Sequence, residues 1–123
     1  MYNYYNPNPL GNHVGDCTVR ALCKALNKDW EEVYSALTLY GFTYADMPSA
    51  NHVWGAYLKE KGFRRMIIDE DGLYTVKDFC RDNPRGIYIL AIQEHVVCVV
   101  DGVYYDSWDS GNCVPLYAWK RDN

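Results

Sequence analysis

Apolar side chains recur every three or four residues in the first half of the chain, which is the spacing of amphipathic helices. A first helix is predicted over residues 16–26. Its buried stripe consists of Val19, Leu22, Cys23 and Leu26. A second helix is predicted to begin at Asp29, a favourable N-cap, and to end at Gly41. A third is predicted between Ser49 and Gly62.

The second half of the chain changes to short runs of apolar and β-branched residues, which are typical of strands. Strands are predicted at residues 65–68, 87–92, 95–100, 103–108 and 114–119. Thr75 is expected to cap a short helix that runs to about Arg81. Residues 1–14 are rich in proline and asparagine and predict an irregular arm. Helices therefore precede an antiparallel sheet, which indicates an α+β fold.

The dipeptide Asp101-Gly102 is a strong signal for a two-residue hairpin turn. Directly opposed residues in a hairpin share a face, and so do residues two apart along a strand. With this turn, Asp106 becomes the diagonal neighbour of His95 on one face. The predicted register therefore selects one carboxylate, among several nearby, as the partner of this imidazole.

Composition narrows the class of protein. With 123 residues, of which 49% are hydrophobic, the chain is expected to form a single domain. The net charge is −4 and the 12 Lys and Arg residues are scattered, so no nucleic-acid partner is expected. No signal peptide or membrane-length apolar run is present, and the five irregularly spaced cysteines suit reduced thiols. We therefore expect a cytoplasmic protein that does not bind membranes.

Cys17 carries the most information, because it falls where a turn is predicted to become a helix. The positive end of a helix dipole favours the thiolate, which is the nucleophilic form of cysteine. A histidine can take the thiol proton, and a carboxylate can orient the imidazole. Cys17, His95 and Asp106 are therefore predicted to be nucleophile, general base and acid, and orienting residue of a hydrolase.

Such a mechanism also needs two donors that stabilise an oxyanion. The backbone N–H of Cys17 is one candidate, because amides at a helix start have no intrahelical partner. The second is expected from a side chain just upstream, and Asn12 is the candidate. No cofactor or metal is predicted. His95 and Cys98 lie three residues apart on a strand and so face opposite ways.

These residues resemble the papain-like cysteine peptidase clan, which has the order Cys, His, then Asp or Asn. The segment Asp106-Ser107-Trp108 is similar to the clan's Asn-Ser-Trp motif. The run Gly-Asp-Cys ending at Cys17, before an apolar helix, resembles short bacterial and phage members, including bacteriocin leader-cleaving peptidases. The resemblance implies a papain-like fold over residues 1–123, and it implies that Trp108 shields the histidine–carboxylate hydrogen bond.

The leading interpretation is a cysteine hydrolase that cleaves a peptide or isopeptide bond of a peptide or protein substrate through a thioester. One alternative is a catalytically degenerate papain-like module that binds a protein partner. Gly11 favours it, because it occupies the position of the family's oxyanion-hole glutamine. Another alternative is acyl transfer of the transglutaminase or deamidase type with the same triad. The many aromatic residues either fill core and surface or line a groove for an extended ligand.

Overall fold

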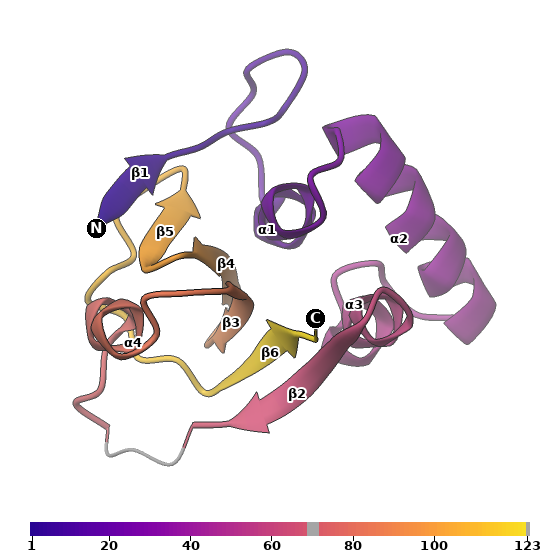
Figure 1. Cartoon of the computed structure of the whole chain (residues 1–123). Helices are drawn as coiled ribbons and strands as arrows, with labels where there is room; N and C mark the ends of the chain where they lie inside the picture. The colour runs from indigo at the N-terminus through magenta and orange to yellow at the C-terminus, as the bar shows by residue number, and fades with distance from the viewer. Residues whose placement is uncertain (69–71, 123) are drawn as a thin grey trace.

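The described residues, 1–68 and 72–122, form four helices and six strands in the computed structural model. The helices are α1 (Cys17–Leu26), α2 (Trp30–Tyr44), α3 (Asn51–Glu60) and α4 (Val76–Asp82). The strands are β1 (Tyr2–Tyr4), β2 (Phe63–Ile67), β3 (Ile87–Ile92), β4 (His95–Val100), β5 (Val103–Asp106) and β6 (Tyr117–Arg121). All six belong to one sheet, in the order β1-β5-β4-β3-β6-β2 (Figure 1).

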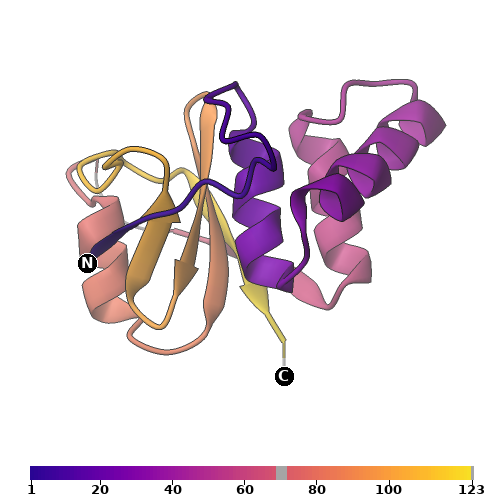
Figure 2. The same cartoon turned by 90° about the horizontal axis from the view of Figure 1, so that it is seen from above.

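Two apolar cores hold the helices on the sheet. Helices α1, α2 and α3 lie on one face and α4 lies on the opposite face (Figure 2). The core under the three helices includes Leu22, Val33, Leu37, Trp54, Leu58 and Ile89. The core under α4 includes Val76, Phe79, Leu90, Val97 and Tyr104. In the described part of the chain, no helix combines the length and the apolarity that crossing a membrane requires.

The α+β class is confirmed, but the sheet is mixed and not purely antiparallel. β1 pairs in parallel with β5, with Tyr2 opposite Tyr104 and Tyr4 opposite Asp106. The prediction of an irregular arm over residues 1–14 was therefore wrong at its start. Without β1, β5 would be an edge strand with unpaired backbone groups. Such groups can pair with a short extended segment, and the pairing does not depend on the side chains of that segment. The N–H of Tyr5 also donates to the carbonyl oxygen of Asp106 at 2.8 Å.

Helix α2 continues to Tyr44 and does not end at Gly41 as predicted. Gly41 is buried inside the helix, where the returning chain crosses it closely. A Cβ added to Gly41 would lie 2.7 Å from the carbonyl oxygen of Asp46 and 3.1 Å from the nitrogen of Pro48. The glycine therefore serves close packing of backbone on backbone. The left-handed residue that ends the helix is Ala45.

The central hairpins follow the prediction. β3 and β4 span the predicted residues, and Val100 pairs with Val103 across the turn. Asp101 and Gly102 have φ angles of 50° and 78°, as a type I′ turn requires. β5 ends at Asp106, earlier than predicted.

The loop between β5 and β6 begins and ends at residues that are set by local features of the chain. At the end of β5, the carboxylate of Asp106 accepts the N–H of Ser107, which leaves that N–H out of the sheet. β6 begins at Tyr117 and not at residue 114. The intervening Pro115 has no N–H for a ladder.

Replacing Gly41 by alanine tests the close crossing at α2. The change normally stabilises a helix by about 1 kcal/mol. Here the added methyl group would meet backbone atoms, and we expect a loss of about 1–3 kcal/mol in the free energy of unfolding. Urea unfolding measures it. Ser35→Ala, at an exposed position of the same helix, is the control and should leave stability equal or slightly higher. Equal stabilisation by both variants would contradict the packing role of Gly41.

Candidate active site

Cys17 is the first residue of α1, and the carboxylate of the residue before it bonds to side chains and not to the backbone of the helix. Asp16 is the N-cap, but its carboxylate makes no capping hydrogen bond. Its Oδ1 accepts from Arg20 at 2.9 Å and its Oδ2 from the indole N–H of Trp30 at 2.9 Å. The first-turn amides of α1 therefore receive no side-chain cap from Asp16. These amides remain available to an anion beside the thiol.

The hairpin brings His95 and Asp106 together as the predicted register requires. His95 is the first residue of β4 and Asp106 the last of β5, and His95 Nε2 lies 2.6 Å from Asp106 Oδ2. A carboxylate can only accept, so Nε2 carries the proton. Nδ1 is then the imidazole nitrogen left to face the thiol of Cys17.

Asp106 is fully buried, with a relative accessibility of 0%, and both of its oxygens are saturated. Oδ1 accepts from Arg20 at 2.9 Å and from the N–H of Ser107 at 2.8 Å. Oδ2 accepts from the hydroxyl of Ser110 at 2.6 Å as well as from His95. Burial raises the pKa of Asp106, but the hydrogen bonds from His95 and Ser110 and the charge of Arg20 bring the net pKa below its ordinary value. The carboxylate is therefore ionised at neutral pH.

Arg20 joins the two halves of the site. Its side chain is only 5% exposed, and its guanidinium forms ion pairs of 2.9 Å with both Asp16 and Asp106. One partner belongs to the start of α1 and the other to the end of β5. The planar fork of arginine can bind two carboxylates in this way, whereas the single ammonium of lysine cannot bind them with the same geometry.

The electrostatics of Cys17 and His95 favour an ion pair. Burial raises the pKa of the Cys17 thiol, but hydrogen bonds from His95 and the backbone of Val96, with the nearby charges, lower its net pKa. Burial lowers the pKa of His95, but hydrogen bonds with Asp106 and Cys17 raise it to about 9. At neutral pH the pair is thus shifted towards thiolate and imidazolium.

The other four cysteines behave in the opposite way. Burial raises the pKa of Cys23, Cys80, Cys98 and Cys113. Among the five cysteines, Cys17 is the one whose pKa is lowered.

The remaining two predicted site residues differ in where they lie. The Trp108 ring packs against His95, with centroids 4.7 Å apart, while 47% of the residue stays exposed. This position suits the predicted shielding role. Asn12 is exposed, and its backbone is bonded to the side chains of Asn6 and Asn8. Its role in an oxyanion hole remains a prediction.

A cavity of about 290 Å³ lies beside the thiol and includes a residue that the sequence did not indicate. Cys17, His95, Ser49 and Asn51 are among its lining residues, and Asn12 is not. The side-chain oxygen of Asn51 accepts the indole N–H of Trp54 at 3.2 Å. The amide nitrogen of Asn51 is thereby left to donate to a ligand in the cavity. An asparagine at a helix start gives no sign in the sequence of which cavity it lines.

Arg20 and Ser110 were also missed. A usable signal for Arg20 is its place beside the buried stripe of the first helix, where a charged residue that becomes covered must have a partner. Ser110 carries no such signal, because the loop after β5 has no periodicity. Within residues 1–68 and 72–122, no three His, Cys, Asp or Glu side chains are grouped closely enough to hold a metal ion.

Comparisons with known proteins leave the site to be interpreted from its own geometry. No protein-family model, curated protein or solved structure matches the chain. The geometry is that of a cysteine at a helix start, an imidazole beside it and a buried carboxylate behind the imidazole.

Arg20→Met tests the buried ion pairs. The variant leaves two buried carboxylates without their cation, and we expect the free energy of unfolding to fall by about 3–5 kcal/mol at pH 7. Urea unfolding measures the loss. Arg64→Met is the matched control, because Arg64 pairs with Asp122 on the surface, and it should cost less than about 1 kcal/mol.

The stability difference between wild type and Arg20→Met should also depend on pH. The depressed pKa of Asp106 contributes stability above its unfolded-state value of about 3.9, and that contribution is lost as the pH falls through the folded-state pKa. The gap between wild type and Arg20→Met should therefore stay constant from pH 7 to about pH 5 and shrink as the pH falls below about 4. A gap that is constant with pH would show that lost packing, and not charge, accounts for the effect.

Proposed function

We propose that the protein is a papain-like cysteine hydrolase that cleaves a peptide or isopeptide bond through Cys17, His95 and Asp106. The observation that carries the proposal is the 2.6 Å contact between His95 and Asp106, in a site where His95 and Cys17 line the same cavity and His95 lowers the pKa of the thiol. A merely structural histidine would not need both partners. The order of helices before a sheet agrees with a papain-like fold.

In the first half-reaction the thiolate of Cys17 attacks the carbonyl carbon and forms a C–S bond. The imidazolium of His95 gives its proton to the leaving nitrogen as the C–N bond breaks, which releases an amine and leaves a thioester. Asp106 remains ionised and holds the imidazole with Nδ1 towards the thiol.

In the second half-reaction, His95 is neutral and takes a proton from water. The resulting hydroxyl attacks the thioester carbon, the C–S bond breaks, and a carboxylic acid leaves while the thiolate and imidazolium are restored. The sum is hydrolysis of one amide by one water. An amine in place of water would give the transfer reaction with the same residues.

Both half-reactions pass through an oxyanion, for which two donors are available in the cavity. The N–H of Cys17 lies at the uncapped start of α1. The second donor that we propose is the side-chain amide of Asn51, which lines the same cavity as the thiol. This assignment replaces a donor upstream of the cysteine with one from α3.

A neighbouring apolar cavity offers room for part of an extended substrate. It has a volume of about 400 Å³ and is lined by the side chains of Trp30, Tyr34 and Leu37. The rings of Trp30 and Tyr34 are stacked, with centroids 4.8 Å apart. Thr18 and Ser49 line both this cavity and the one beside the thiol. A peptide bound at Cys17 can therefore place an apolar side chain here.

Thiol alkylation tests the proposed nucleophile. At pH 6 we expect Cys17 to react with iodoacetamide at least about tenfold faster than any other cysteine, because each unit of pKa changes the thiolate fraction about tenfold. In His95→Ala the largest interactions that lower the pKa of Cys17, the hydrogen bond and the charge of His95, are lost while the burial of the thiol remains, so the rate at pH 6 should fall. Mass spectrometry of the labelled peptides over time measures each rate.

The same ion pair sets the pH range of hydrolysis. Turnover should rise as Cys17 loses its proton and fall as the pH passes about 9, where His95 loses the proton that the leaving group needs. Equal labelling of all five cysteines would contradict the enzyme proposal. The binding-module interpretation would then be favoured.

Acetylation by p-nitrophenyl acetate tests the oxyanion donor. This ester passes through an oxyanion, whereas alkylation by iodoacetamide does not. We expect Asn51→Ala to slow the burst of nitrophenol by about 10²-fold or more. Alkylation of Cys17 should remain unchanged, which also shows that the variant is folded.

Asn12→Ala is the matched control and should leave both rates unchanged. The reverse result, with acetylation lost in Asn12→Ala and kept in Asn51→Ala, would restore the donor that the sequence predicts and remove Asn51 from the mechanism.

A further inference from the structure

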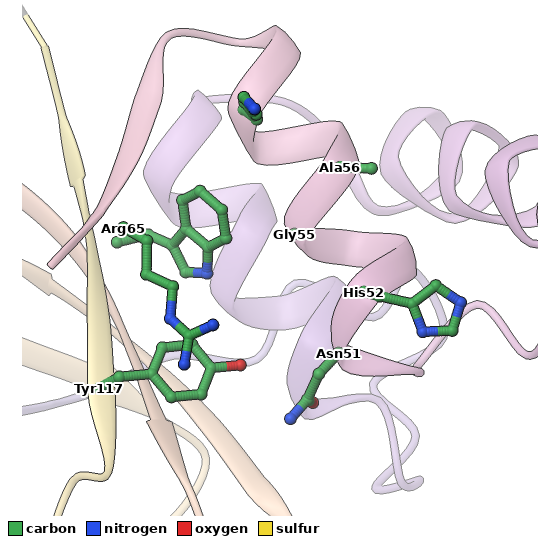
Figure 3. A pocket seen from close by; sticks show the side chains of 8 residues that line it. Asn51, His52, Gly55, Ala56, Arg65 and Tyr117 are labelled. Carbon is green, nitrogen blue, oxygen red and sulfur yellow. The ribbon is translucent and has the colours of Figure 1, made fainter. Parts of the chain in front are cut away.

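Besides the apolar cavity at Trp30, another cavity lies next to the one that Cys17 lines, and it is called the second cavity. It has a volume of about 400 Å³ and is bounded by α3 on one side and by β2 and β6 on the other (Figure 3). Asn51 lines both cavities. A ligand that lies along Asn51 can therefore reach from the thiol into this second cavity.

The second cavity has a cationic lining in a protein of net charge −4. Arg65 and Lys59 both contribute to it. Among the described residues, no carboxylate pairs with either of them. His52 also lines the cavity, but its Nε2 lies 3.3 Å from the carboxylate of Asp46, and it is directed away from Arg65 (Figure 3). Within the described residues, two cationic side chains are thus available to an anionic ligand.

Arg65 is held in place by the sheet. It lies opposite Trp119 in the β2–β6 register, and its guanidinium carbon is 4.0 Å from the centre of the Tyr117 ring (Figure 3). Stacking on an aromatic ring orders the guanidinium plane while its N–H groups remain free at the edge. Such a fork matches the two oxygens of a carboxylate.

Trp119, which lines this cavity, has an unsatisfied donor. The indole N–H of Trp119 is buried and has no hydrogen-bond partner among the described residues. Gly55 allows the ring to approach α3, because a Cβ there would lie 3.0 Å from it. A buried N–H without an acceptor is unfavourable, and a carboxylate drawn in by Arg65 would supply one.

We propose that this second cavity is a subsite for a carboxylate of the substrate, with Arg65 as its main ligand and Trp119 and Lys59 as further donors. The proposal deepens the proposed function and rests on it for the identity of the ligand as a peptide. Because Asn51 is shared, the carboxylate belongs close to the scissile bond. It is either an acidic side chain or the terminal carboxylate of a short peptide.

Binding of small carboxylates tests the subsite without any catalysis. The probes are N-acetylglutamate N′-methylamide, which has only a side-chain carboxylate, and N-acetylalanine, which has only an α-carboxylate. The matched glutamine N′-methylamide is the neutral control. We expect an acidic probe to shift the indole N–H resonance of Trp119 saturably in ¹H–¹⁵N spectra, assigned with Trp119→Phe, and the neutral probe to leave it in place.

Arg65→Gln should weaken this binding at least about tenfold, since it removes the charge-assisted bonds. Arg64→Gln is the control, because the neighbouring residue on β2 faces the other side of the sheet, and it should bind as wild type does. The probe that binds identifies the source of the carboxylate. No saturable shift with either acid, or equal affinity in Arg65→Gln, overturns the subsite.

A reactive probe separates this result from the proposed function. Chloroacetyl peptides and peptide chloromethyl ketones deliver an electrophile to Cys17 from the two chain directions. At one position, glutamate should give at least tenfold faster labelling than glutamine in wild type and Arg64→Gln, and no preference in Arg65→Gln. Rapid labelling without any charge preference rejects the subsite alone. An unreactive Cys17 with saturable binding at Trp119 rejects the hydrolase and retains the anion site.

Discussion

Arg20 lies between two buried carboxylates, and this pair of ionic contacts connects the helix that carries Cys17 to the hairpin that carries His95. Asp16 precedes Cys17 directly, and Asp106 holds His95. A buried ion pair is a poor source of net stability, because desolvation of the charges offsets most of their attraction. Its value here is geometric, since any shift of α1 along the sheet would separate a charge from its partner in a medium that does not solvate it.

The rest of the fold protects this arrangement. β1 covers the open edge of β5 and supplies the N–H of Tyr5 to the carbonyl of Asp106. The backbone of Asp106 is thereby bonded from one side while its carboxylate is bonded from the other. Trp108 and Ser110 come from the loop that follows, so the segment that leaves β5 closes around the residue that ends it.

Sequence reasoning succeeded where one local rule decides the outcome. The turn at Asp101-Gly102 sets the register, and the register places Asp106 against His95, so this contact was predictable. The first helix likewise followed from the pattern of apolar residues, and it begins one residue after the predicted start. In these cases the signal and its consequence lie within a dozen residues of each other.

It failed where the deciding contact depends on how the chain packs and not on a local sequence rule. Gly41 looks like a helix end unless the crossing chain at Asp46 is known, and residues 2–4 become a strand only because β5 has a free edge. Asn51 is the clearest case in the site. Its role depends on the packing of α3 beside α1, and no spacing relates it to Cys17.

The position of Asn51 also links chemistry to specificity. Its oxygen is held by Trp54, and its residue lines both the cavity of the thiol and the cationic cavity at Arg65. A substrate carboxylate at Arg65 would draw the adjacent backbone along Asn51, where the donor for the oxyanion is placed. Binding energy at a group remote from the reacting carbonyl can then be used to position that carbonyl, which raises the rate and not merely the affinity. Asn51 is the wall that the two cavities share. In the proposed mechanism, recognition of the substrate's charge and stabilisation of the transition state are therefore coupled through this residue.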